Sequence, residues 1–460
     1  MRIRFWGTRG SLAKPGPATV RYGGNTACVE IRGPDDALIV LDCGTGAHEL
    51  GQHLLASGAQ PIRGTLLITH THWDHIQGFP FFAPLFAQGN EWDVYAPQGL
   101  GQRLEDTLAG QMEYTYFPIT LGQLGATIRY HELSEGAFEL GGVRVTAHYL
   151  NHPGLVLGYR LEAGGTVVVY ATDHEPHSPH QREPAGSRAQ ALPVHREDQR
   201  HIEFLAGADL VIHDAQYTLE EYPKKVSWGH TPAEWAVDFA LAAEARRLAL
   251  FHHDPMRSDE ALDRLVHTCR ERAAAADRGR LEVFAAAEGR MIELADQDAL
   301  PSQGPAAAAG PGPAGGRSGP PTILLVDDDP DILQLLSMTL RPEGFRLLSA
   351  SDGNAALEIA RAERPDLLLL DWNMPGRDGL EVCRALRAGT DPELRNVPVV
   401  LLTGQTRAED TAAGFAAGVT DYLTKPFKPA YVRARVHAWL LRSRTAAAGG
   451  AAPPESRRVE

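Results

Sequence analysis

The segment of residues 64–75 reads GTLLITHTHWDH, in which four potential metal ligands, His70, His72, Asp74 and His75, follow directly on an apolar run. A short run of leucine and β-branched residues predicts a buried strand. The four ligands are therefore expected on the turn at the carboxyl end of that strand, where layered α/β folds usually place their sites. This pattern predicts a metal centre on an α/β scaffold.

Length and composition predict a globular protein with more than one domain. The chain has 460 residues, which is more than one hydrophobic core normally serves. No apolar run approaches the roughly 20 residues that span a bilayer, and the first residues lack the features of a signal peptide. We therefore expect a cytoplasmic protein without a membrane segment.

The four cysteines and the net charge exclude several classes of site. Cys28, Cys43, Cys269 and Cys383 show no Cys-x-x-Cys spacing, which argues against a disulfide framework and a thiolate zinc site. Any metal must then be held by histidine and aspartate. The formal net charge of −14 disfavours an extended nucleic-acid groove, because phosphate contacts need clustered Lys and Arg.

A segment rich in Ala, Gly and Pro divides the chain at residues 296–321. Such a composition has little to bury and predicts a mobile, partly extended linker. We expect a first domain at residues 1–295, a second at residues 322–443 and a disordered tail at residues 444–460.

Further ligand-type residues follow other predicted strands of the first domain, among them His152, Asp173 and His252. With the motif at residues 70–75, this domain resembles the metallo-β-lactamase superfamily, whose His-x-His-x-Asp-His motif matches it. The resemblance implies an αββα sandwich, with the site on the edge between the two sheets. It covers roughly residues 1–295.

The resemblance also implies a complete set of ligands for two metal ions. They are His70, His72 and His152 for one ion, Asp74, His75 and His252 for the other, and Asp173 as the bridge. Imidazole and carboxylate ligands suit zinc, which is the default, and also manganese or iron. Two positions stay open, since His253 competes with His252 and His148 competes weakly with His152.

A pair of cations at this site predicts a hydrolase. Two cations about 3.5–4 Å apart lower the pKa of a bridging water and stabilise charge on the attacking and leaving oxygens. Asp74 is expected both to bind metal and to orient the hydroxide. The superfamily hydrolyses amides, thioesters, lactones and phosphodiesters, so the motif indicates the reaction type better than the substrate.

Residues 211–215, 229–232 and 5–11 resemble the phosphodiesterase branch that includes ribonuclease Z and related cyclic phosphodiesterases. In this interpretation His230 donates a proton to the leaving oxygen, and Asp214 orients the His230 side chain. We expect a small phosphodiester or a cyclic nucleotide as substrate. A lactonase or other ester hydrolase, and a non-enzymatic metal-domain sensor in a signalling complex, are the alternatives.

Other histidines and aromatic residues near these motifs receive no role. We expect solvated loop residues at five positions, His174, His177, His180, His195 and His201. Five aromatic residues could form a pocket wall beside the metals: Trp73, Phe79, Phe81, Phe82 and Phe86. Packing in the core is the more usual position of such side chains, and we expect it here.

The second half alternates apolar runs with helical segments over about 120 residues, which predicts a parallel, doubly wound sheet. Polar residues follow its predicted strands and would converge at one edge: Asp327, Asp328, Asp371, Asn373, Thr403 and Lys425. Clustered carboxylates need a divalent cation to relieve their repulsion, and Mg²⁺ prefers oxygen ligands. The pattern predicts a magnesium site.

This half resembles the receiver domain of two-component response regulators, which has a flavodoxin-like (βα)5 fold. The resemblance implies that Asp371 is the phosphoryl acceptor. It further implies that Asp327, Asp328, Asp371 and Asn373 hold Mg²⁺. Thr403 and Lys425 would contact the phosphoryl group, and Tyr422 would be an aromatic switch.

Together the two halves predict a response regulator whose output is a dinuclear metallohydrolase that precedes the receiver. The expected partners are a sensor histidine kinase or phosphotransfer protein and a small-molecule substrate, and no pair of DNA-binding helices follows Leu441. Phosphorylation of Asp371 is expected to control the hydrolase. A flexible tether favours control through docking or through formation of a homodimer.

Overall fold

The computed structural model describes residues 1–58, 61–98, 103–177, 196–277, 280–294, 319–404, 417–427 and 429–448. Most of the predicted linker, residues 296–318, and residues 449–460 of the predicted tail lie outside this set. The chain divides into two compact units, one formed by residues 1–179 and 197–310 and the other containing residues 311–460. Among the described residues, no helix is both long and apolar enough to cross a membrane.

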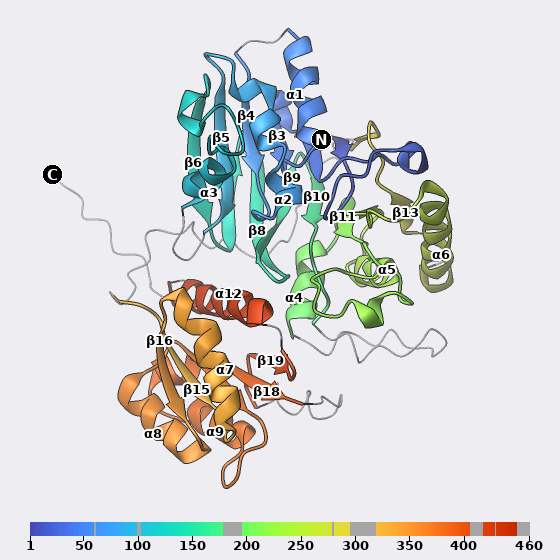
Figure 1. The fold of residues 1–460 in the computed structure, drawn as a ribbon. Coiled ribbons are helices and arrows are strands. Elements are labelled where there is room, and N and C mark those ends of the chain that lie inside the picture. Colours follow the sequence, from blue (N-terminus) through green and yellow to red (C-terminus); the bar gives the residue numbers. More distant parts are fainter. Residues whose placement is uncertain are drawn as a thin grey trace, which may run out of the picture. The chain divides into compact units, whose positions relative to one another are not determined.

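Two seven-stranded sheets form the first unit (Figure 1). One sheet has the order β14-β1-β2-β3-β4-β5-β6, with β1 (Arg2–Gly7), β2 (Cys28–Arg32), β3 (Leu38–Leu41), β4 (Arg63–Leu67), β5 (Glu91–Pro97), β6 (Thr127–Leu133) and β14 (Met291–Glu293). The other has the order β13-β12-β11-β10-β9-β8-β7, with β7 (Gly136–Leu140), β8 (Val143–Asn151), β9 (Leu155–Ala163), β10 (Thr166–Ala171), β11 (Leu210–Asp214), β12 (Arg247–Phe251) and β13 (Glu282–Ala285).

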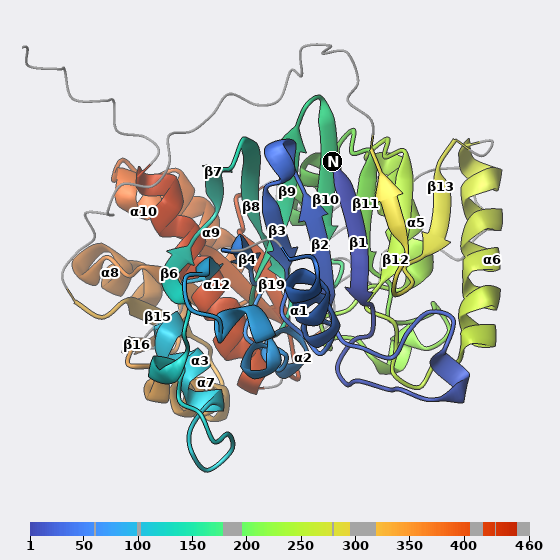
Figure 2. The ribbon, with the colours of Figure 1, turned by 90° about the horizontal axis from the view of Figure 1, so that it is seen from above.

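The two sheets pack face to face, and helices cover their outer faces. Phe5 of β1 and Phe251 of β12 meet between the sheets, with ring centroids 6.2 Å apart. On one outer face α1 (Gly46–Ala56) and α3 (Leu104–Gln111) bury leucines against β3, β4 and β5. On the other, α4 (Arg196–Leu205), α5 (Ala233–Ala242) and α6 (Asp259–Asp277) cover β10 to β13, and α6 runs beside β13 (Figure 2). The predicted αββα sandwich is confirmed.

The register of the strands brings the carboxyl ends of several strands to one end of this sandwich. β10, β11 and β12 are parallel, with Ala171 opposite His213 and Asp214 opposite Phe251. Asp173, Asp214 and His252 therefore lie at the same edge. The short helix α2 (Trp73–Ile76) follows β4.

The second unit is a five-stranded parallel sheet of order β16-β15-β17-β18-β19. Its strands are β15 (Thr322–Val326), β16 (Arg346–Ala350), β17 (Leu367–Asp371), β18 (Val399–Thr403) and β19 (Asp421–Thr424). The helices among its described residues are α7 (Pro330–Leu340), α8 (Gly353–Glu363), α9 (Gly379–Arg387), α10 (Pro392–Asn396) and α12 (Pro429–Ala448). The last of these extends into the segment predicted to be disordered.

Both faces of this sheet are covered, as a doubly wound fold requires. Successive strand residues point to opposite faces. Leu368 and Leu370 pack with α8 and α9, whereas Leu367 and Leu369 pack with α7 and α12. This alternation explains why β17 is an uninterrupted leucine run, and it confirms the predicted flavodoxin-like fold.

Candidate metal centre and phosphoryl-acceptor site

The ligands predicted for the first domain converge from four strand ends. His70 and His72 lie between β4 and α2, Asp74 and His75 lie in α2, and the others are His152 after β8, Asp173 after β10 and His252 after β12. Their ligand atoms form groups in which all atoms lie within 4.8 Å of one another, including His70, His72 and His152, and Asp74, His75 and His252. We refer to these two groups as the first and second triads.

Asp173 lies between the two triads. Its Oδ1 is 3.2 Å from Nε2 of His75 and 3.2 Å from Nε2 of His252, in the second triad. Its Oδ2 is 3.7 Å from Nε2 of His70 and 3.7 Å from Nε2 of His152, in the first triad. One carboxylate oxygen thus faces each triad, which is the geometry of a bridging ligand.

The backbone is held in a left-handed conformation at two of these positions. The φ angles are 56° at Asp173 and 58° at His252, and Asp42 behind the site has a φ of 59°. Such angles are uncommon for residues other than glycine, and they concentrate at functional sites.

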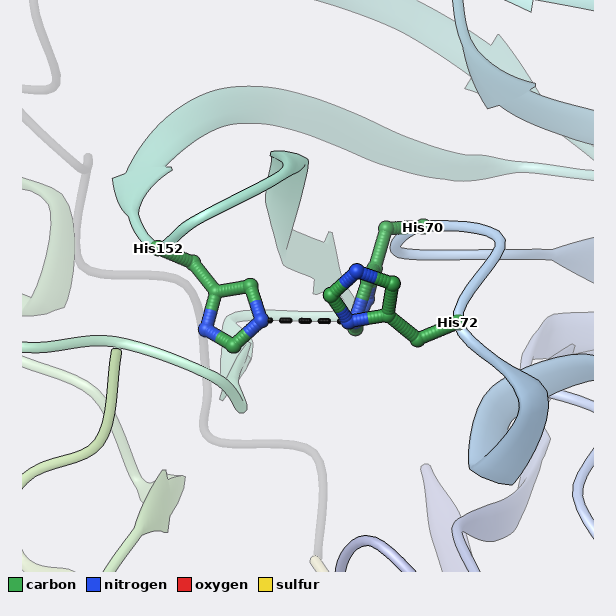
Figure 3. Close-up of side chains that lie close together, drawn as sticks. All are labelled: His70, His72 and His152. Atoms are coloured by element: carbon green, nitrogen blue, oxygen red, sulfur yellow. Dashed lines mark hydrogen bonds between the residues drawn. The ribbon is translucent and has the colours of Figure 1, made fainter. Parts of the chain in front are cut away.

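The chemistry of the cluster fits metal ions. Nε2 of His70 and Nε2 of His75 are buried and make no hydrogen bond to any residue that the structure describes, although buried polar atoms are normally paired. His72 and His152 face each other, with Nδ1 and Nε2 3.2 Å apart (Figure 3). Burial lowers the pKa of His152 to about 3 and that of His70 well below its ordinary value, so both imidazoles are neutral and can donate a lone pair.

Hydrogen bonds behind three ligands orient their rings. Nδ1 of His75 donates to Asp42, at 2.8 Å from Oδ2. Nδ1 of His152 donates to the Gly229 carbonyl at 3.0 Å, and Nδ1 of His252 donates to Gln216 Oε1 at 3.0 Å. Each imidazole therefore turns Nε2 towards the centre, as is usual around protein metal sites.

Nothing in the sequence indicates that Asp42 and Gln216 orient the imidazoles of the proposed ligands. Asp42 is fully buried, and its carboxylate also accepts hydrogen bonds from Thr69 and from the Tyr170 hydroxyl. Gln216 lies after β11 and is buried as well. Only the fold brings these polar groups behind the histidines.

Asp74 is held as a carboxylate. Burial opposes its ionisation, but His75 and His252 outweigh burial and keep the pKa of Asp74 well below its ordinary value. Asp74 Oδ2 lies 3.3 Å from His75 Nε2 and 3.1 Å from His252 Nε2. The backbone N–H of Ser11 donates to the same oxygen at 2.7 Å.

The predicted acid pair lies beside the triads. Nδ1 of His230 is 2.7 Å from Asp214 Oδ2, and the His230 ring stacks on His252 with centroids 4.9 Å apart. Burial alone would lower the pKa of His230, but Asp214, with Asp173 and Asp74, outweighs burial and raises it to about 9. In the metal-free chain this imidazole is therefore protonated near neutral pH.

The alternative ligands make other contacts. His253 directs Nε2 to the Ala286 carbonyl at 2.9 Å, and His148 pairs with Glu135 at 2.6 Å. The structure therefore places His252 and His152, rather than these alternatives, in the triads.

Three of the remaining histidines are not solvated as expected. His174 and His201 are buried, and their rings stack with centroids 3.8 Å apart. The His177 side chain is 5% exposed, and its Nδ1 lies 3.2 Å from Asp198 Oδ1. His180 and His195 lie outside the described residues.

The aromatic residues divide into two groups. Phe79 and Phe82 are fully buried in the core, as expected, and Phe86 packs against it. Trp73 is 75% exposed and Phe81 is 55% exposed. The expectation of core packing is wrong for these two side chains.

The second unit gathers its acidic residues at the carboxyl ends of β15 and β17. Oxygens of Asp327, Asp328 and Asp371 lie within 4.8 Å of one another, so the group could hold a cation. Lys425 Nζ lies 2.7 Å from Asp327 Oδ2 and 2.6 Å from Asp371 Oδ1. Burial raises the pKa of Asp371, although Lys425 opposes the shift.

The other predicted residues of this unit lie in or just after β17, β18 and β19. Asn373 is exposed and lies two residues after β17, and Thr403 is buried at the end of β18. Tyr422 is half-buried in β19, and its ring stacks on Trp372 with centroids 5.7 Å apart. The structure thus brings the predicted residues of the phosphoryl-acceptor site to one edge of the sheet.

Comparison with known proteins finds a matching family model for each unit. A model of the beta-lactamase superfamily domain matches residues 38–253, and a model of the response regulator receiver domain matches residues 323–437. The DNA-binding response regulator MtrA of Mycolicibacterium smegmatis is 46% identical over 121 residues, which are 26% of this chain and 51% of MtrA. The chain spans about half the length of the curated relatives it matches.

Two solved structures illustrate the similarity. The metallo-beta-lactamase fold protein YhfI from Bacillus subtilis is 18% identical, with a TM-score of 0.44, and the match covers 63% of this chain and 98% of YhfI. The chemotaxis protein CheY4 of Vibrio cholerae is 33% identical, with a TM-score of 0.25, and the match covers 26% of this chain and 98% of CheY4.

Proposed function

Because the chain joins a beta-lactamase superfamily domain to a response regulator receiver domain, we propose that it is a dinuclear metal-dependent phosphodiesterase under the control of receiver phosphorylation. The substrate is a small phosphodiester or a cyclic nucleotide. The observation that carries the proposal is the position of Asp173 between two triads, beside the His230–Asp214 pair.

The protein groups have separate roles in this proposal. The first triad would hold one ion and the second triad the other, with Asp173 between them; zinc is the default, and manganese or iron suits the same ligands. When bound, such a pair of ions supplies a hydroxide nucleophile and neutralises charge on the phosphoryl oxygens. Asp74 would bind metal and orient the nucleophile, while Asp42, Gly229 and Gln216 hold the imidazoles in place.

His230 is the proposed general acid. Its Nδ1 is occupied by Asp214, which leaves Nε2 to donate a proton to the leaving alkoxide oxygen. Backbone N–H groups of Gln216 and Thr231 hold the other Asp214 oxygen, so the carboxylate cannot rotate away. A protonated imidazole also complements the negative charge of a phosphodiester, which an uncharged lactone lacks.

A substrate panel on metal-reconstituted protein tests this function. We expect hydrolysis of bis-p-nitrophenyl phosphate and of cyclic nucleotides, and no comparable hydrolysis of acyl lactones. His230→Ala should lower kcat by about 100-fold, with unchanged metal content. Hydrolysis of lactones alone would instead favour the ester-hydrolase alternative. Inertness on the whole panel with both sites loaded would favour the non-enzymatic sensor.

The receiver is proposed to accept a phosphoryl group at Asp371 from a sensor histidine kinase or a phosphotransfer protein. Asp327, Asp328, Asp371 and Asn373 would hold Mg²⁺, and Thr403 and Lys425 would contact the phosphoryl group. Tyr422 is the proposed switch residue, and control would pass to the hydrolase through docking or homodimer formation. We therefore expect a small-molecule phosphoryl donor to change the hydrolase rate of the native chain but not of Asp371→Asn. Equal rates in all four conditions would contradict the coupling.

A further inference from the structure

The metal cluster reaches solvent on the side of His72. Among the seven proposed ligands His72 is exposed, whereas His70, His75 and the others are buried. A substrate must therefore approach from this side. The side chains around His72 are the ones that meet whatever is attached to the reacting phosphoryl group.

Two exposed tryptophans lie in the segments next to this side of the cluster. Trp73 directly follows His72 and is 75% exposed. His72 faces His152 (Figure 3). Nδ1 of His152 donates to the carbonyl of Gly229, the residue after Trp228. Trp228 is 47% exposed. Two short contacts thus connect the segments that carry the two indoles.

The segment that carries Trp228 is held firmly in place. The buried carboxylate of Glu175 accepts hydrogen bonds from the backbone N–H groups of Ser227 and Gly229, both at 2.7 Å. Gly229 has a φ of 88°, and an added Cβ there would lie 2.1 Å from His152 Nδ1. Glu175 therefore holds the backbone on both sides of Trp228, and Gly229 also contacts the ligand His152.

Lys225 adds a positive charge beside Trp228. Its Nζ lies 4.0 Å from the centroid of the Trp228 ring, which is a cation–π distance. The segments next to His72 and His152 thus carry two exposed indoles and one ammonium group. Large aromatic side chains are costly to expose, and exposed indoles beside a cation suit stacking of a flat ring that is attached to an anion.

We propose that Trp73 and Trp228 form a ring-recognition edge, which selects phosphodiesters that carry a nucleobase. This inference rests on the phosphodiesterase function proposed above. Lys225 supports the Trp228 ring and faces the anionic substrate. The edge provides binding and specificity, whereas the triads and His230 carry the reaction.

The first test compares substrates with and without the ring on the metal-loaded full chain. Adenosine 2′,3′-cyclic phosphate carries the ring, and glycerol 1,2-cyclic phosphate lacks it. We expect Trp73→Ala and Trp228→Ala to raise KM for the adenosine compound by about tenfold, with little change in kcat or metal content. KM for the glycerol compound should not change. The Phe variants at both positions should restore most of the binding.

Tyr114→Ala is the matched control, since Tyr114 is another aromatic residue, 83% exposed, outside the segments around His72 and Gly229. It should leave both KM values unchanged. Equal KM values of the native chain for the two substrates would overturn the inference, as would equal effects of the Trp variants on both substrates.

A binding measurement separates this inference from the proposed function. Adenosine monophosphate, titrated into the metal-loaded chain, should quench tryptophan fluorescence, whereas inorganic phosphate should not. The quenching should decrease in Trp73→Ala and in Trp228→Ala. Quenching without any phosphodiesterase activity would support the edge and overturn the proposed function. Phosphodiesterase activity with equal KM values for substrates with and without the ring, and without quenching, would overturn the ring-recognition edge alone.

Discussion

Asp42 accepts a hydrogen bond of 2.8 Å from Nδ1 of His75, and both side chains are fully buried. The same carboxylate accepts from the Thr69 backbone at 2.7 Å and from the Tyr170 hydroxyl at 2.8 Å. Two other groups of the core, the Thr69 backbone N–H and the Tyr170 hydroxyl, therefore fix Asp42 independently of His75. It determines which nitrogen of His75 faces Asp173.

Asp42→Asn should weaken metal binding without removing a ligand. The amide keeps the size of the side chain but removes the negative charge that supports the His75 imidazole, and changes of this kind typically cost tenfold or more in metal affinity. Zinc affinity can be measured by competition with a chromophoric chelator. Asp93→Asn is the control, because Asp93 is a partly exposed residue paired with Arg129 on β6. Equal affinity of the two variants would contradict the support role.

Asp173→Asn should weaken binding at both triads, whereas His252→Ala should weaken binding at the second triad alone. The reason is that the two Asp173 oxygens face different triads. Asn also tolerates the left-handed backbone at this position. Metal content per chain and stepwise metal affinities distinguish the two variants. A single weakened site in Asp173→Asn would contradict the bridging position.

The pair of His230 and Asp214 should make the stability of the metal-free chain depend on pH. The pKa of His230 is raised to about 9 in the fold, above the unfolded value of about 6.5. The stabilisation is then fully present below pH ~6.5 and is lost as pH rises through about 9. Asp214→Asn should remove it.

Urea unfolding of the metal-free chain checks this pH dependence. The difference in free energy of unfolding between the native chain and Asp214→Asn should be largest near pH 6 and should shrink by pH 10. Side-chain NMR of His230 should show its titration move to lower pH in the variant. An equal difference at both pH values would exclude His230 as the titrating group.

Lys425→Ala should destabilise the receiver in the absence of Mg²⁺. The ammonium group lies between Asp327 and Asp371, and its loss leaves two carboxylates in mutual repulsion. Because Lys425 is only partly buried, we expect a loss of about 1 kcal/mol after solvent screening. Saturating Mg²⁺ should restore most of this loss, since the cation takes over the neutralising role.

Arg346→Ala is the matched control for that variant. Arg346 pairs with Glu363 at 2.7 Å, but both side chains are largely exposed, so the loss should be smaller and independent of Mg²⁺. Unfolding can be followed by the fluorescence of Trp372, next to Asp371, and of Trp439 in the core of the same unit. A loss that Mg²⁺ does not reverse would contradict a cation site at these carboxylates.

The motif at residues 70–75 and the leucine run of β17 could be interpreted from the sequence because their information is local. The spacing of the ligands within one turn follows from neighbouring residues, and an unbroken apolar run predicts a strand that is covered on both faces. The fold of both units and the identities of the clustered residues could be predicted in this way, with the family resemblance as support.

The choice between His252 and His253 could not be made from such local information. Both are histidines after the same strand, and the left-handed backbone at His252, with a φ of 58°, turns one towards Gln216 and leaves the other facing the Ala286 carbonyl. The supporting role of Asp42 and the exposure of Trp73 likewise depend on which distant segments pack nearby. Local patterns in the chain thus specify strands, helices and candidate ligands, whereas the pairing of distant strands sets which of these side chains meet, because contact across sheets has no period along the sequence.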